Sequence, residues 1–200
     1  MNFISGNCYH IYNQGNNKQK LFESTPDDYL TFLSLIRTHL VPNSNLMAYC
    51  LMPNHFHFLI QADDRCEESV RIGPVPTNPI SRGIQQILVT YTRVINKRNG
   101  KTGSLFRQRT HARCLDTESI AIEDQRAKQD DLLNCFLYIH RNPLDASLVD
   151  DLSKWAYSSY LEYAGLRNGT LVNKDIALEK GIYDPKYFRF QFEDFPKQPT

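Results

Sequence analysis

The alternation of apolar and polar residues predicts that the chain begins with a strand and continues into a helix. Residues 7–14 alternate with the period of two that is typical of a half-buried strand. After a turn, Thr25 has the position of a helix N-cap, and Pro26 that of the first helical residue. Apolar residues then recur at helical spacing as far as about Leu40. We therefore expect a helix over 26–40 that packs against the first strand.

The middle of the chain predicts a hairpin of two strands, a loop, a long amphipathic helix, a fourth strand and a last helix. The turn Met52-Pro53-Asn54 separates the two strands of the hairpin. Asn78-Pro79 has the features of a helix start, and Asn99-Gly100 has those of a helix end. The expected elements are strands over 46–51 and 55–61, a surface loop over 63–77, a helix over 79–99, a strand over 104–115, and a helix over 130–142 that Pro143 ends.

This order of elements predicts an α+β fold of the ferredoxin-like class. Strand, helix, strand, strand, helix, strand is the sequence of a split βαβ sandwich, an antiparallel sheet with helices on one face. A chain of 200 residues is long enough to bury one substantial core. No apolar run approaches the roughly 20 residues of a membrane span, so we expect no membrane partner. Five cysteines without a close pair favour reduced thiols in a cytoplasmic protein.

The charges are unevenly distributed along the chain. The net charge is only +1, yet the stretch from Ser69 to Leu115 contains no Asp or Glu. Segregation of this kind is typical of a surface that contacts a polyanion, although a solvated basic face is the simpler alternative. The positive residues of this stretch are Arg71, Arg82, Arg93, Lys97, Arg98, Lys101, Arg107, Arg109 and Arg113.

Two histidines in the predicted hairpin have the spacing of metal ligands. His55 and His57 are two residues apart in a strand, so their side chains lie on the same face. Imidazoles suit borderline metals, and Mg²⁺ or Mn²⁺ tolerates a mixed shell of nitrogen and oxygen. The pair alone is equally typical of two half-exposed histidines that bind nothing.

The predicted helix over 130–142 adds a candidate nucleophile. Apolar residues group on one arc of this helix, whereas Tyr138 lies on the polar arc. Tyr138 and Asn142 are one turn apart and project from the same side. This pairing places a phenol beside an amide oxygen that can hold a metal. His140 is offset from Tyr138 by roughly 200° around the helix, which favours a structural role for it.

The combination of these segments resembles the HUH single-tyrosine transposases, and most closely the REP-associated tyrosine transposases. The resemblance rests on Met52-Pro53-Asn54-His55-Phe56-His57 together with Tyr138-Ile139-His140-Arg141-Asn142-Pro143. It extends over residues 1–163, whereas 164–200 form an unmatched C-terminal extension. Supporting matches are Tyr9-His10-Ile11-Tyr12-Asn13-Gln14-Gly15, Ser104-Leu105-Phe106-Arg107-Gln108-Arg109, Leu148-Val149 and Trp155-Ala156-Tyr157-Ser158-Ser159-Tyr160.

The resemblance implies an enzyme that cuts and rejoins single-stranded DNA. His55, His57 and Asn142 correspond to the ligands of Mg²⁺ or Mn²⁺, and Tyr138 corresponds to the nucleophile that forms a 5′-phosphotyrosine link. The implied partner is single-stranded or hairpin DNA, bound by a monomer or homodimer in the bacterial cytoplasm, at the nucleoid when on DNA. Phe106 stands where the family commonly has Trp, and the segments 63–78 and 116–130 look longer than usual.

Arginines near the predicted fourth strand are the first candidates for contacts with DNA phosphates. Bases could stack on exposed aromatic side chains, with Phe106 preferred over Tyr91. The full set of expected DNA contacts is Arg107, Arg109 and Arg113, with Arg93, Lys97 and Arg141 in addition.

Two other functions fit parts of the pattern. A ferredoxin-like module that binds single-stranded nucleic acid without catalysis would need neither the histidine pair nor the tyrosine. A metal-dependent hydrolase that activates water would cleave DNA without a covalent intermediate, but the set contains no acidic ligand or general base.

Overall fold

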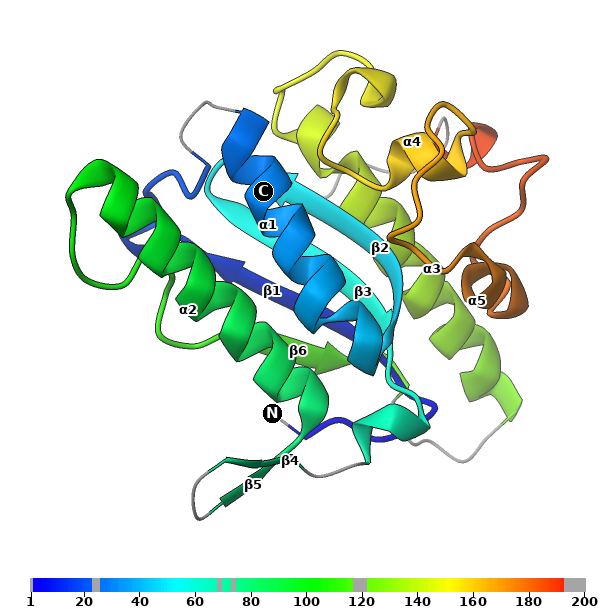
Figure 1. The fold of residues 1–200 in the computed structure, drawn as a ribbon. Helices are drawn as coiled ribbons and strands as arrows, with labels where there is room; N and C mark the ends of the chain where they lie inside the picture. Colours follow the sequence, from blue (N-terminus) through cyan, green and yellow to red (C-terminus); the bar gives the residue numbers. More distant parts are fainter. Residues whose placement is uncertain (1, 23–25, 68–69, 73–74, 117–121, 193–200) are drawn as a thin grey trace.

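The protein is described by a computed structural model that covers residues 2–22, 26–67, 70–72, 75–116 and 122–192. Its strands and helices, which short 3-10 turns connect in places, are shown in Figure 1. In chain order they are β1 (Cys8–Gln14), α1 (Pro26–His39), β2 (Asn45–Met52), β3 (His55–Gln61), β4 (Val70–Ile72), β5 (Val75–Thr77), α2 (Pro79–Asn99), β6 (His111–Cys114), α3 (Ile122–Asp145), α4 (Tyr160–Tyr163) and α5 (Lys174–Glu179).

The main sheet has four strands in the order β2-β3-β1-β6, and every neighbouring pair is antiparallel. With α1 between β1 and β2, and α2 between β3 and β6, this is the connectivity of a split βαβ sandwich. The predicted α+β, ferredoxin-like class is therefore confirmed. Strands β4 and β5 form a separate small hairpin inside the segment where we expected a loop.

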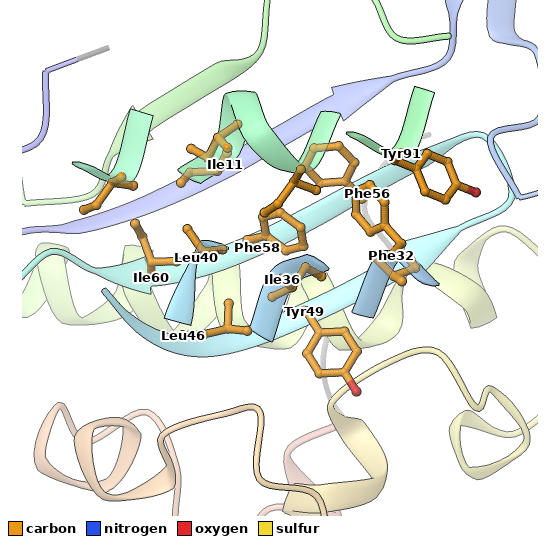
Figure 2. Close-up of a cluster of buried hydrophobic side chains, with 14 of the residues drawn as sticks. Ile11, Phe32, Ile36, Leu40, Leu46, Tyr49, Phe56, Phe58, Ile60 and Tyr91 are labelled. Carbon is orange, nitrogen blue, oxygen red and sulfur yellow. The ribbon is translucent and has the colours of Figure 1, made fainter. Parts of the chain in front are cut away.

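The alternation along β3 decides which side chains enter the main core. Phe56, Phe58 and Ile60 lie on one face of the strand and are buried beneath α1 and α2. Figure 2 shows these side chains with Phe32 of α1 and Tyr91 of α2. The period of two leaves His55, His57 and Leu59 on the opposite face.

Helix α3 covers part of that opposite face, so helices lie on both sides of the sheet rather than on one (Figure 1). The reason is that β1, β2 and β3 also bear apolar residues there, including Cys8, Cys50 and Leu59, which are fully buried. Phe136 and Ile139 of α3 pack in this second cluster. The prediction of helices on a single face was wrong in this respect.

The C-terminal segment belongs to the same second cluster. Ala177, Ile182, Tyr183 and Phe188 are buried there, and the Phe188 ring lies 6.0 Å from that of Phe136. Part of the segment after residue 163, with Phe188 nearest to Phe136, is thus packed against the helix that contains Tyr138.

Three element boundaries differ from those expected. Helix α3 begins at Ile122 rather than near residue 130. Helix α3 continues through Pro143 to Asp145, because a proline so close to the end removes only one helical hydrogen bond and has a helical φ. The last strand is shorter than 104–115, since regular pairing with β1 is limited to His111–Cys114, and the residues before it form only an isolated bridge, between Phe106 and Gly15 just after β1. Within the described chain, no helix is both long enough and apolar enough to cross a bilayer.

The aromatic cluster around Phe32 should contribute strongly to stability. Phe32 is fully buried, and its ring lies 5.0 Å from Tyr91 and 5.4 Å from Phe56. Phe32→Ala should lower the free energy of unfolding by about 3–5 kcal/mol in urea denaturation. Leu30→Ala, on the exposed side of the same helix, should change it by less than about 0.5 kcal/mol. Equal effects of the two substitutions would contradict this description of the core.

Candidate active site

Three histidines come together on the face of the sheet that α3 partly covers. His55 and His57 project from β3, and their ring centroids are 5.0 Å apart. His10, from the adjacent strand β1, places its Nε2 atom 2.9 Å from Nδ1 of His57. The other ring nitrogen of His57, Nε2, is buried and has no hydrogen-bond partner among the described residues.

Helix α3 brings Tyr138 and Asn142 to the same place. The side chain of Asn142 lies close enough to both His55 and the Tyr138 phenol to contribute to the pKa of each. It also donates a hydrogen bond of 2.8 Å to the backbone carbonyl of Tyr138, one turn earlier. The Tyr138 ring stands edge-on to His57, with centroids 5.4 Å apart. The four residues that we predicted as nucleophile and ligands therefore lie in one cluster.

Burial sets the protonation of these groups. It lowers the pKa of His55 and, with the neighbouring imidazoles, holds the pKa of His57 well below its usual value. Both rings are therefore neutral near pH 7, and each has a lone pair to share. Burial raises the pKa of Tyr138, and the nearby Asn142 side chain lowers it in part. The phenol is protonated at rest and needs assistance to act as a nucleophile.

The donor atoms of this cluster fit a divalent cation. A buried ring nitrogen without a partner, beside a second imidazole and an amide oxygen, is a mixed nitrogen and oxygen set. In the described part of the chain, no three His, Cys, Asp or Glu side chains form a metal site by themselves. Binding of Mg²⁺ or Mn²⁺ here would thus use Asn142 as the third protein ligand.

The chain is similar in structure to a REP-associated tyrosine transposase that was solved with a REP hairpin bound. The similarity covers 86% of this chain and 92% of that one, with a TM-score of 0.53 and a sequence identity of 15%. The chain has the fold of a REP-associated tyrosine transposase. Neither the models of protein families nor the curated proteins include one that matches the sequence.

Two further residues of this transposase-like fold lie next to the cluster, and the sequence did not reveal their role. Tyr12 of β1 and His111 of β6 stack with ring centroids 4.9 Å apart and an angle of 9° between the ring planes. Both are exposed, and Tyr12 lies 5.8 Å from His57. The alternation in Tyr9-His10-Ile11-Tyr12 contained the signal, because it places His10 and Tyr12 on one face. Phe106 and Tyr91 are buried in the main core, so the prediction that bases stack on them was wrong.

The predicted DNA-contacting cations are spread over different surfaces of the transposase fold. Arg113 lines a pocket of about 320 Å³ with His10 and Tyr138, and it forms an ion pair with Asp131. Arg93 and Arg107 line a separate groove between α2 and the segment before β6. Lys97 and Arg109 are exposed. Among these residues, Arg113 is the one that shares a pocket with the tyrosine.

Arg141, in contrast, is buried within the transposase-like fold. Its Nε atom donates to Asp145 at 2.8 Å, and both side chains are 9% exposed. A second donor, Nη1, lies 3.5 Å from the carbonyl oxygen of Phe192. The neighbouring His140 is also buried and lies 2.7 Å from the Ser159 hydroxyl. Both residues connect α3 to the segments around it, and this geometry favours a structural role for Arg141 over a contact with DNA.

Substitution of Arg141 should therefore affect folding. Arg141→Met leaves the Asp145 carboxylate buried without its partner, which should lower the free energy of unfolding by about 3 kcal/mol or more. The double variant Arg141→Met/Asp145→Leu should recover most of that loss, and the exposed Arg109→Met should change little. Urea denaturation measures all three. Unchanged stability of Arg141→Met together with weaker DNA binding would instead indicate a DNA contact.

Proposed function

We propose that the protein cuts and rejoins single-stranded DNA next to a hairpin through a covalent bond to Tyr138. The observation that supports this most is the Tyr138 ring, which stands edge-on to His57 with the centroids 5.4 Å apart. Asn142 follows one turn later on the same helix, and His55 lies beside His57. A tyrosine, an amide and two imidazoles from distant segments thus lie together, which is more than a purely binding module of this fold requires. The transposase of similar fold, which was solved with a REP hairpin, makes hairpin DNA the proposed partner.

In the proposed reaction, the Tyr138 oxygen attacks the phosphorus of the scissile phosphodiester. A bond forms between phosphorus and the phenol oxygen, and the bond from phosphorus to the 3′ oxygen breaks. The phenol loses its proton, and the departing oxygen gains one to become a 3′-hydroxyl. The DNA keeps a 5′-phosphotyrosine link that retains one phosphodiester bond, so another 3′-hydroxyl can reverse the step without ATP.

The other residues of the cluster would orient the Tyr138 phenol and bind the phosphate. Asn142 lies beside the phenol and lowers the pKa of Tyr138, which favours its ionised form. The residues that would hold Mg²⁺ or Mn²⁺ are His55, His57 and Asn142, and a bound cation there would stabilise charge on the phosphate. Arg113 offers a positive charge in the pocket that Tyr138 lines. The exposed Tyr12 and His111 rings offer a surface on which an unpaired base can stack.

Tyr138→Phe should abolish the covalent product while leaving DNA binding intact. The test incubates the chain with a hairpin oligonucleotide that has labelled single-stranded flanks, in Mn²⁺, and separates denaturation-resistant protein–DNA adducts by electrophoresis. The native chain should form the adduct, EDTA should prevent it, and Tyr138→Phe should form none. Tyr187→Phe, at an exposed tyrosine of the C-terminal segment, should behave as the native chain.

The same experiment separates the proposal from its rivals. An adduct formed by Tyr138→Phe would exclude Tyr138 as the nucleophile. Cleavage without any adduct would indicate hydrolysis by water, and tight binding with no cleavage by the native chain would indicate a non-catalytic module.

His10 should support metal binding through His57. For Nε2 of His57 to bind a cation, the proton of that ring must be on Nδ1, where His10 can accept it. His10→Ala should weaken Mn²⁺ binding by about tenfold or more, as measured by calorimetry without DNA. His10→Gln, which keeps an acceptor, should lose less, and His39→Ala in α1 should lose nothing. Equal Mn²⁺ affinities for all four proteins would show that His10 does not orient His57.

A further inference from the structure

A second pocket adjoins the candidate active site and shares His55 with it. It has a volume of about 470 Å³, within the range of roughly 300–1,000 Å³ that small-ligand sites occupy. Its lining comes from four places in the chain: the segment after β1, Tyr29 of α1, the residues at and around the turn between β2 and β3, and the loop that follows α3. Tyr138 lines the other pocket described above, not this one.

The pocket has apolar walls and a positive rim. Phe22 and Met52 are buried and form part of the wall, and the partly exposed Leu148 closes one side. Lys18 and Lys20 are exposed and line the same pocket. Its described lining residues include no carboxylate. A planar apolar group joined to a negative charge complements this surface, and a nucleotide in single-stranded DNA has both parts.

Unusual backbone conformations are concentrated in the two loops that border the pocket. In the described chain, the non-glycine residues with left-handed φ are Asn17 at 52°, Lys18 at 58° and Ser147 at 55°. Such conformations are costly and are found mainly where they serve a ligand-binding loop.

The first of these loops is held tightly. The Lys18 amide donates to the Gly15 carbonyl at 3.1 Å, and a β-carbon on Gly15 would lie 2.2 Å from the Gln19 carbonyl oxygen. Lys18 therefore projects from a fixed turn.

We propose that this pocket binds the base of an unpaired nucleotide that flanks the phosphate attacked by Tyr138, while Lys18 and Lys20 contact the adjoining phosphates. The inference rests on the proposed function, since it assumes that single-stranded DNA passes the His55 cluster. Because His55 belongs to both places, a strand bound at the active site continues directly into this pocket. The subsite would fix the position of the cut relative to the hairpin.

The first test removes the base. Binding of hairpin oligonucleotides to the Tyr138→Phe protein in Mn²⁺ is measured by fluorescence anisotropy, with an abasic site placed in turn at each flanking position. At one flanking position, the abasic site should lower the affinity of the protein for the oligonucleotide by about tenfold or more. Ala146→Trp, which places an indole in the pocket, should remove the difference between the intact and abasic oligonucleotides at that position.

The second test removes the positive charges of Lys18 and Lys20. Unlike Ala146→Trp, it does not require a large side chain to fit into the pocket. Lys18→Gln/Lys20→Gln should reduce the slope of log affinity against log salt by about 1.4, or roughly 0.7 for each phosphate contact. Lys154→Gln/Lys186→Gln, with the same change of charge elsewhere, should keep the native slope.

Either of two results would overturn the inference: no flanking position sensitive to base removal, or the same salt slope for both lysine pairs. Adduct formation at Tyr138 with no effect of base removal would leave the proposed function standing and exclude the subsite. An effect of base removal at one position, without any adduct, would support a base-binding pocket and exclude the proposed cleavage by Tyr138.

Discussion

The whole site depends on the register of β3 between β1 and β2. Because side chains alternate along a strand, the pairing that buries Phe56 and Phe58 beneath α1 and α2 also turns His55 and His57 to the other face. A slip by one residue would expose the phenylalanines and bury the histidines in the main core. The large aromatic core therefore determines the direction in which the imidazoles point. The register that gives the most stable core is also the one that forms the candidate site.

Helix α3 supplies the other half of the site for a related reason. Its apolar residues, among them Phe136 and Ile139, pack on the part of the sheet where β1, β2 and β3 have buried small or aliphatic side chains. That packing fixes the rotation of the helix and directs Tyr138 and Asn142 toward the histidines. The Tyr138 ring then packs edge-on against His57, so that the strand and the helix meet within the polar part of the interface.

The sequence predicted the parts of the structure that local rules govern. The period of two in β3 and the helical spacing around Tyr138 placed four residues on faces that the fold then brings together. Helices α1 and α2 begin and end close to the expected residues because a capping asparagine, prolines and a glycine mark their ends. Local rules do not show which face a later helix covers, and so the position of α3 behind the sheet was not foreseen. They also did not distinguish a buried arginine such as Arg141 from one that reaches DNA. Its partner Asp145 is one turn later but beyond the expected helix end at Pro143, and the burial of the pair arises only in the fold.

The segment after residue 163 gives α3 a second packing surface besides the sheet. The Phe188 ring contacts those of Phe136 and His140, and the Phe192 carbonyl lies within reach of Arg141. A helix that packs against the sheet on one side and against this segment on another is restrained in its rotation. The orientation of Tyr138 and Asn142 therefore depends on residues that lie about 50 positions later in the sequence, although none of those residues belongs to the cluster of histidines.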